Sequence, residues 1–595
     1  MKFRSLYKWE NVDGQENLIF VAQLLEEMLF HYTIDTYKPS VMDTPLLVHE
    51  ALTTIEEVER GNIKEPNIRH VLEELCDSFG KDTIAQKLVP LDRNEIFSAL
   101  KDPKSNRNKV KNILGILNNC LNDIEYKNLL EKEIISLSLN SETKFSELRR
   151  LIRGYITNLI SHGYHPYFIR KKMLSFFWEG SGKIVNAHDL VNFFEIFCFK
   201  QKNYHVYSVV DKVFLLYQES NNATTIPWIK FYEKSQLPTI ISNSNFLKIG
   251  ENEIFCLMEE IKDIDPYSAR ESAENILKFN ADLINIFHHK KRPVWKNKFI
   301  VIDCEESKTI SIEKPLHTML KCIDLKEQKA KIKIQSFVKS FSLENGSFSK
   351  FINSIRLHSM ALHNESIENQ ILNLWIALES LVPSDTKNSD ESNIEHIIES
   401  LIPFLNITYI SNLIENLVKD LIRWNVYIVR KILKDIAGDG FKNKLVNLLI
   451  KEEYSANFDN LINETRDFYL LKDRLIYFKD MLSSKKKVNS IITAHKKRLE
   501  WQIRRIYRTR NLIVHTGNTP QYTHSLIEHT HNYLDIVLNT LISLATLPNQ
   551  INSVGEGFDY ISLQYKSFLK SCCEDKDIKL NDGNLKMLVD IINFR

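Results

Sequence analysis

Helix-breaking residues are scarce in this chain of 595 residues, which contains only 16 glycines and 15 prolines. Glycine costs backbone entropy in a helix and proline removes a hydrogen-bond donor, so both residues interrupt helices. Between these few breakers, apolar residues recur at every third or fourth position, for example in residues 17–32, 108–124 and 498–515. This period places apolar side chains on one face of an α-helix. The sequence therefore predicts a mainly α-helical protein.

The helical pattern is interrupted in the middle of the chain, which divides it into three regions. Residues 1–155 and 346–595 keep the helical period. Residues 156–345 differ, because residues 203–217 are rich in β-branched and aromatic side chains, and residues 298–315 resemble two short strands around a polar turn. We expect a helical N-terminal region, a smaller α+β middle segment and a C-terminal helical bundle.

Composition and charge are those of a folded soluble protein, with 43% hydrophobic and 26% charged residues. The formal net charge is only +2, so a site for a phosphate-rich polymer would have to be a local basic patch. The cysteines are scattered without the paired spacing of a zinc site, which favours reduced thiols in a cytoplasm. The charged first residues are not typical of a signal peptide, and the longest apolar stretch, residues 534–547, is too short to span a bilayer. We therefore expect a cytoplasmic protein without a membrane partner.

Three patterns resemble binding motifs but lack a required partner. Residues 179–183 (EGSGK) match part of a phosphate-binding loop, yet a polar turn is the better interpretation. His288 and His289 stand in a basic stretch without an acidic or cysteine partner, which favours a basic loop. No two of three further histidines are spaced four apart, as two ligands on one helix face would be; they are His524, His529 and His531. We expect no metal site and no cofactor.

The stretch from Lys485 to Arg510 is strongly basic, with ten lysines and arginines and one acid, Glu500. On a chain with little net charge, this local excess favours binding to phosphate groups. The alternative is a solvated helix face, which normally mixes charges of both signs. The side chains expected to bind the phosphate-bearing partner are Lys496, Lys497, Arg504, Arg505 and Arg508.

The basic stretch ends in an arginine, an asparagine and a histidine within six positions. Asn511 and His515 are four residues apart and share a helix face, while Arg510 lies about 140° round an ideal helix from His515. Gly517 predicts the end of this helix. A histidine moves protons near neutral pH, and a guanidinium holds two phosphate oxygens. An asparagine can orient the histidine and arginine side chains. Because RNA carries its own nucleophile, the 2′-hydroxyl, such a group could cleave RNA without a metal ion.

The spacing alone is weak, because an arginine followed by a histidine after four to six residues is expected by chance about once or twice in a chain of this length. Arg356 and His363 match the spacing too. The tighter arrangement of Arg510, Asn511 and His515 at the end of a basic helix is much rarer.

Two stretches together resemble the Apea-like branch of the HEPN superfamily. Residues 508–518 match its motif of an arginine and an asparagine followed by a histidine, and residues 358–382 resemble its first long helix. The two stretches occur in the family's order and bracket about a third of the chain. The resemblance implies a helical bundle that dimerises around a shared cleft and cleaves RNA without a metal ion.

Carried onto this sequence, the resemblance implies a role for each motif residue. Arg510 would bind phosphate, Asn511 would orient the other two side chains, and His515 would be the acid–base residue. Glu379 stands where the family has a glutamate on its first helix; from the residues alone, a salt bridge at the edge of the core explains it equally well. About 130 residues separate Glu379 from Arg510, which is longer than expected and predicts helices inserted within the domain.

The resemblance also implies a biological setting. Many members of the family act in prokaryotic antiviral defence by killing or arresting the infected cell, so we expect a toxic ribonuclease with RNA as its substrate. The chain would form a homodimer or a higher even-numbered oligomer, and residues 1–345 would sense a phage-derived or protein trigger. Two alternatives stay open. A non-catalytic HEPN module would bind RNA or protein but would usually have lost the arginine or the histidine, and a metal nuclease would need clustered acidic residues that the sequence does not reveal.

Overall fold

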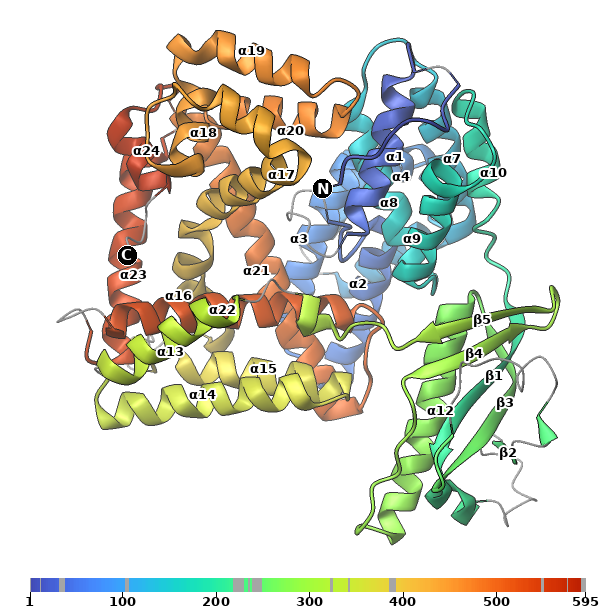
Figure 1. Ribbon diagram of the computed structural model, residues 1–595. Coiled ribbons are helices and arrows are strands. Elements are labelled where there is room, and N and C mark those ends of the chain that lie inside the picture. The colour runs from blue at the N-terminus through green and yellow to red at the C-terminus, as the bar shows by residue number, and fades with distance from the viewer. Residues whose placement is uncertain are drawn as a thin grey trace. The chain divides into compact units, whose positions relative to one another are not determined.

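The computed structural model describes residues 2–10, 12–30, 38–101, 106–217, 229–233, 236–237, 249–321, 325–340, 343–384, 392–546, 551–574 and 576–589. As predicted, the described part is mainly α-helical and contains a small antiparallel sheet (Figure 1). The chain divides into two compact units, which we call the helical unit and the sheet unit. The helical unit comprises Met1–Tyr7, Asn11–Thr157 and Thr318–Arg595, and the sheet unit comprises Lys8–Glu10 and Asn158–His317.

Aspartates begin several helices in the N-terminal part of the helical unit. The Asp43 carboxylate accepts a hydrogen bond from the backbone N–H of Leu46, and Pro45 occupies the first turn of that helix. Such a cap satisfies a donor that the first turn of a helix leaves unpaired. The helices are α1 (Glu16–Met28), α2 (Thr44–Glu59), α3 (Pro66–Lys81), α4 (Thr83–Leu88), α5 (Arg93–Leu100), α6 (Arg107–Cys120), α7 (Asp123–Ser138) and α8 (Phe145–Ser161).

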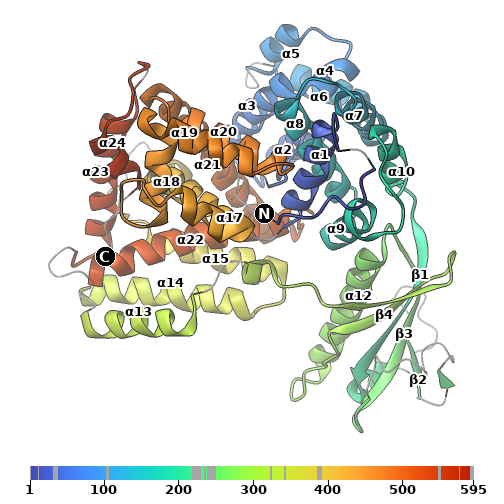
Figure 2. The same ribbon diagram turned by 45° about the horizontal axis from the view of Figure 1, so that its top comes forward.

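The C-terminal part of the helical unit contains longer helices, and Figures 1 and 2 both show α14, α15 and α22 side by side. The helices are η6 (Thr318–Lys321), α13 (Glu327–Ser340), α14 (Asn345–His363), α15 (Ile367–Leu381), α16 (Asn393–Ile407), α17 (Tyr409–Ile432), α18 (Gly440–Ile450), η7 (Glu452–Tyr454), α19 (Ser455–Glu464), α20 (Tyr469–Met481), α21 (Lys485–Thr516), α22 (Thr523–Thr546), α23 (Val554–Cys572) and α24 (Asp582–Val589). The helical character predicted for residues 346–595 is confirmed over the described part.

Helices from the two ends of the chain share one core in the helical unit. Helix α1 packs on α20, and α3 packs on α21. Arg474 of α20 is fully enclosed and forms ion pairs with Glu27 of α1, at 3.1 Å, and with Asp420 of α17. Removing one partner of such a buried pair leaves an uncompensated charge, which is strongly destabilising. The N-terminal and C-terminal helices therefore stabilise one another.

Residues 358–382 belong to two helices, α14 and α15, rather than to one long helix. Asn364 accepts a hydrogen bond from the backbone N–H of Ser366 at 2.8 Å, and the Ser366 hydroxyl accepts one from the backbone N–H of Asn369 at 3.2 Å. Bonds of this kind compete with helical hydrogen bonds and favour a turn followed by a new helix. Residues 358–382, which resemble the family's first long helix, thus contain a turn between two helices.

One apolar stretch, Asn393–Ile432, is long and apolar enough to cross a membrane by length and composition alone. It consists of α16 and α17, contains Pro403, and has a non-helical backbone at Asn425. Of its most apolar window, 72% is buried inside the helical unit, which is what a core helix of a soluble protein also shows. The sequence analysis had singled out residues 534–547 instead, and those residues lie mostly in α22.

The sheet unit is built from an antiparallel five-stranded sheet in the order β2-β3-β1-β4-β5. The strands are β1 (Lys202–Asp211), β2 (Lys230–Tyr232), β3 (Glu253–Asp263), β4 (Lys298–Asp303) and β5 (Lys308–Glu313). The other elements are α9 (Pro166–Leu174), η2 (Ser175–Glu179), η3 (Ala187–Asp189), α10 (Leu190–Phe194), η4 (Lys212–Tyr217) and α12 (Pro266–Phe287). The strand predicted within residues 203–217 and the hairpin predicted within residues 298–315 are both confirmed.

Helix α12 packs on one face of the sheet (Figure 1). Its apolar side chains Ala273 and Leu277 lie in one core with Val206, Met258 and Phe299 from the three central strands. Loops account for two of the weak motifs, as predicted, because residues 180–182 form bends after η2, and the two adjacent histidines follow the end of α12. In the described part of this unit, no group of three possible metal ligands includes either histidine.

Candidate active site

The predicted motif lies on the last two turns of α21. Gly517 follows the helix in the left-handed conformation, with φ of 68°, and its N–H donates to the carbonyl of Ile513 at 3.0 Å. Glycine adopts this conformation without a steric penalty and commonly ends helices in this way. Gly517 therefore stops the helix as predicted and fixes where the motif is presented.

Arg510 and Asn511 contact each other directly. Arg510 Nη1 donates a hydrogen bond to Asn511 Oδ1 at 2.9 Å. Asn511 is buried, whereas Arg510 is half-buried, and its Nε is enclosed without a hydrogen-bond partner among the described residues. The amide thus holds the guanidinium in a fixed direction without neutralising its charge. Among the described residues, no ion pair matches the charge of Arg510.

His515 stands apart from Arg510 within one chain. Its ring is exposed in the last turn of α21, one turn beyond Asn511. Five residues separate the histidine from the arginine, which places them about 140° apart around the helix axis. The structure therefore brings Arg510 and Asn511 together and leaves the histidine open to solvent on a different side.

Glu379 lies beside Trp375 and is linked through that ring to the motif helix. Glu379 Oε2 accepts a hydrogen bond from Trp375 Nε1 at 2.9 Å, and the buried Trp375 ring packs on Tyr507 of α21. A second carboxylate of α15, Glu368, accepts a hydrogen bond through Oε1 from the Thr519 hydroxyl at 2.9 Å, just beyond the end of α21. Among the described residues, no ion pair or hydrogen bond joins Glu379 to Arg510, Asn511 or His515.

Arg505 and Arg508 are enclosed in an ion-pair network with the N-terminal helices. They are 1% and 3% exposed. Arg505 contacts Glu50 of α2 at 2.9 Å and Glu74 of α3 at 2.5 Å, and Arg508 contacts Glu50 at 2.8 Å. Although burial acts to raise it, the two guanidiniums hold the pKa of Glu50 down at about 2. In this conformation neither arginine can reach a ligand, so their expected role in RNA binding has no support here.

The other three predicted RNA-binding residues are more open but also face acids. Lys497 lies 3.5 Å from Glu73, and Lys496 lies 3.8 Å from Glu500. Arg504 is half-buried, and burial lowers its pKa even though carboxylates lie nearby. The excess of positive charge apparent in the sequence is therefore largely matched by acids from other helices, above all from α3.

A group that could hold a metal ion was missed by the sequence analysis. His531, which had been set aside, lies close to Asp535 on α22 and to His358 on α14. The spacing of four residues between His531 and Asp535 was visible in the sequence, but only histidine pairs had been compared. His358 could not have been found from spacing, because it belongs to another helix.

Comparison of the chain with models of protein families, with curated proteins and with solved structures found no match.

Proposed function

We propose that this protein is a metal-independent endoribonuclease of the HEPN type, acting in the cytoplasm as a toxic effector of prokaryotic antiviral defence. The observation that carries the proposal is the arrangement at the end of α21. There the Arg510 guanidinium, fixed by Asn511, lies within two helical turns of the exposed His515 imidazole. These groups supply charge stabilisation, orientation and proton transfer, which are the functions that RNA cleavage needs.

The proposed cleavage uses the nucleophile of the RNA itself. A base removes the proton of the 2′-hydroxyl, and its oxygen forms a bond to the adjacent phosphorus. The bond between phosphorus and the 5′-oxygen breaks, and an acid donates a proton to that oxygen. The products are a 2′,3′-cyclic phosphate and a 5′-hydroxyl. His515 is assigned to proton transfer and Arg510 to the extra negative charge on the five-coordinate phosphorus.

The angle between Arg510 and His515 favours a site shared by two copies of the chain. One helix cannot easily aim both side chains at one phosphate, because they lie about 140° apart. A two-fold axis beside the end of α21 would place the arginine of one copy opposite the histidine of the other, and such isologous dimers are the commonest oligomers. Val514, which lies between the motif residues, is an exposed apolar side chain that this contact would cover. We expect light scattering to give a dimer or a higher even-numbered assembly.

The non-catalytic alternative is less well supported by the surroundings of α21. A module that only binds RNA needs an extended basic face for phosphate contacts. On α21, Arg505, Arg508 and Lys497 are instead paired with acids of the N-terminal helices. Pairing of these three cations shortens the basic face that could follow an RNA backbone, which favours a local reaction site over a long binding surface.

The proposal is tested by incubating purified protein with RNA in the presence and absence of EDTA. We expect equal cleavage in both, a 2′,3′-cyclic phosphate at the new end, and resistance of a substrate with 2′-deoxyribose at the scissile position. Protein with His515→Ala, purified in parallel, controls for co-purifying nucleases. Cleavage that EDTA abolishes and Mg²⁺ restores would indicate a metal nuclease, and intact dimers that bind RNA without cutting it would indicate a binding module.

A further inference from the structure

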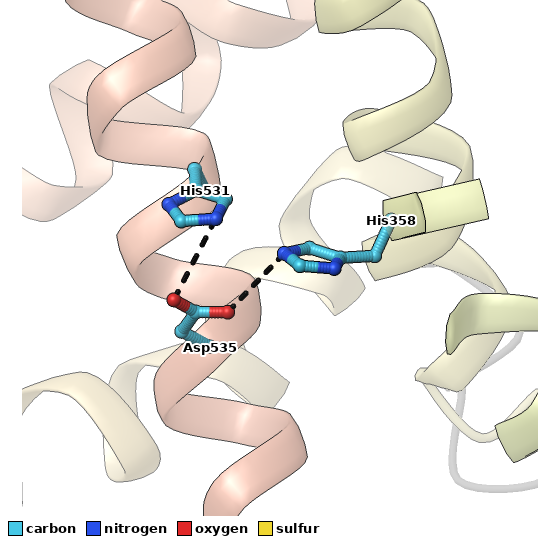
Figure 3. A group of neighbouring side chains, drawn as sticks. All are labelled: His358, His531 and Asp535. Atoms are coloured by element: carbon cyan, nitrogen blue, oxygen red, sulfur yellow. Dashed lines mark ion pairs between the residues drawn. The ribbon is translucent and has the colours of Figure 1, made fainter. Parts of the chain in front are cut away.

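Helices α14 and α22 bring together three potential metal ligands, none of which lies on the motif helix α21. His358 lies on α14, and His531 and Asp535 lie four residues apart on α22. Figure 3 shows the Asp535 carboxylate facing both imidazole rings, with a different oxygen directed toward each. The three ligand atoms all lie within 4.8 Å of one another.

The contacts between the carboxylate and the rings are too long for strong hydrogen bonds. His358 Nε2 lies 3.4 Å from Asp535 Oδ1, and His531 Nε2 lies 3.7 Å from Asp535 Oδ2. A charge-assisted N–H···O bond would be about 2.7–2.9 Å long. Two ligands of a tetrahedral ion with bonds of about 2.0–2.2 Å are about 3.3–3.6 Å apart. The observed spacing therefore fits an interposed cation better than a shared proton.

Burial of the ligand nitrogen supports the same interpretation. His358 Nε2 is enclosed and has no hydrogen-bond partner among the described residues. An enclosed polar atom without a partner costs free energy. The two rings are nearly parallel, with centroids 5.0 Å apart and an angle of 18° between their planes, so small rotations can direct both toward one point. A cation at that point would give His358 Nε2 a partner and would be within reach of His531 Nε2 and the carboxylate.

We propose that His358, His531 and Asp535 form a binding site for one divalent transition-metal ion, for which Zn²⁺ is the best match. Two imidazole nitrogens with one carboxylate suit zinc, whereas Mg²⁺ and Ca²⁺ prefer oxygen ligands. The Asp535 side chain is 35% exposed, so an ion can enter from solvent. Three protein ligands leave a fourth position for water, and the bound ion links α14 to α22.

The metal site and the proposed ribonuclease site are independent. All three ligands lie on α14 and α22, and none lies on α21. Binding of zinc should stabilise the helical unit by mass action, since an ion that binds only the folded state shifts the folding equilibrium. RNA cleavage should not require the ion.

The test is a zinc titration of the full-length chain. Protein stripped with EDTA and dialysed is titrated with ZnCl₂ in competition with a chromogenic chelator. We expect one Zn²⁺ per chain and a Tm that rises with zinc concentration. Cobalt(II) in the same site should give the visible absorption of a four-coordinate site with nitrogen and oxygen ligands. No bound zinc, or a cobalt spectrum of a six-coordinate aqua ion, would overturn the proposal.

Variants locate the bound ion. Asp535→Asn is nearly isosteric, and His358→Ala removes a half-buried ring. Loss of a residue that only hydrogen-bonds to a metal ligand typically weakens metal binding by roughly 10–100-fold. Each of these variants removes a ligand itself and should weaken zinc binding by more than that. His524→Ala, an exposed histidine on the same helix, should bind zinc like the wild type. Unchanged affinity in both ligand variants would overturn the site.

The same variants separate this proposal from the ribonuclease proposal. Asp535→Asn protein that binds no zinc but cleaves RNA at the wild-type rate supports both. Asp535→Asn protein that loses zinc and cleavage together would keep the metal site and contradict metal-independent cleavage. Zinc binding at wild-type affinity by both Asp535→Asn and His358→Ala removes the metal site whatever the rate of RNA cleavage.

Discussion

Two regions of α21 place arginines in opposite environments. Arg505 and Arg508 are enclosed and share the carboxylate of Glu50, while Arg510, a few residues further on, is half-buried and bonds to the neutral amide of Asn511. The first two join the N-terminal helices to α21, and the third has no acidic partner among the described residues. The comparison teaches that acids from other helices, rather than the basic residues themselves, decide which arginines of a basic helix keep a charge that no acid matches.

The largest effect is expected at the exposed end of the helix. Replacing His515 by alanine should lower the rate of RNA cleavage by about 10²–10⁴-fold, the usual contribution of an acid–base group. Its ring is exposed, so the urea midpoint should not change. His363→Ala is the matched control, because His363 follows Arg356 with similar spacing on α14. Equal loss of cleavage in both variants would contradict the assignment.

The next largest effect is expected at the buried region, and it concerns stability. Replacing Glu50 by alanine leaves Arg505 and Arg508 enclosed without their shared partner, which should cost about 3–5 kcal/mol of the free energy of unfolding. Glu73→Ala is the control, since that side chain is 51% exposed and its pair with Lys497 should contribute only about 0–1 kcal/mol. Urea unfolding measures both. Equal, small losses would show that the buried pairs do not hold the helices together.

The buried region should also make stability depend on pH. Burial opposes the shift, but the two arginines lower the pKa of Glu50 from 4.5 to about 2 in the folded chain. Between these values the unfolded chain binds the proton more readily, so the contribution of Glu50 to stability is present above about pH 4.5 and is lost as pH falls toward 2. The difference in stability between wild type and Glu50→Gln should shrink over this window. A difference that stays constant would mean that the pair does not lower the pKa.

The smallest effect is expected for the exposed lysines of α21. Each cation that contacts phosphate makes the plot of log binding constant against log salt concentration steeper by about 0.7–0.9. Lys496 and Lys497 already face Glu500 and Glu73, so replacing both by glutamine should change the slope by less than one such step. Arg510→Gln should change it by about one. A larger change for the lysine pair would place RNA along the length of the helix.

Local sequence signals predicted what local interactions decide. The periodicity of residues 498–515 and the glycine at position 517 predicted the long helix and its end, and the β-branched residues after position 203 predicted the central strand. The turn between α14 and α15 was also encoded locally, by Asn364 and Ser366, but the resemblance to one long helix concealed it.

Interactions between distant segments could not be predicted in this way. Glu50 and Arg505 are separated by 455 positions, so nothing in the neighbourhood of either residue indicates their contact. The basic stretch therefore looked uncompensated, although the fold supplies its acids. The same limit applies to the metal site, where His531 and Asp535 share a helix but His358 comes from another.

The most direct test of this account compares RNA cleavage by Arg510→Gln and Glu50→Gln protein, each assayed below its own unfolding temperature. Glu74→Gln replaces Glu50→Gln if the latter does not fold, because Glu74 also pairs with Arg505. The account predicts that Arg510→Gln keeps the stability of the wild type and loses cleavage, while the glutamate variant loses stability and keeps its rate of cleavage. Wild-type cleavage by Arg510→Gln protein would contradict it.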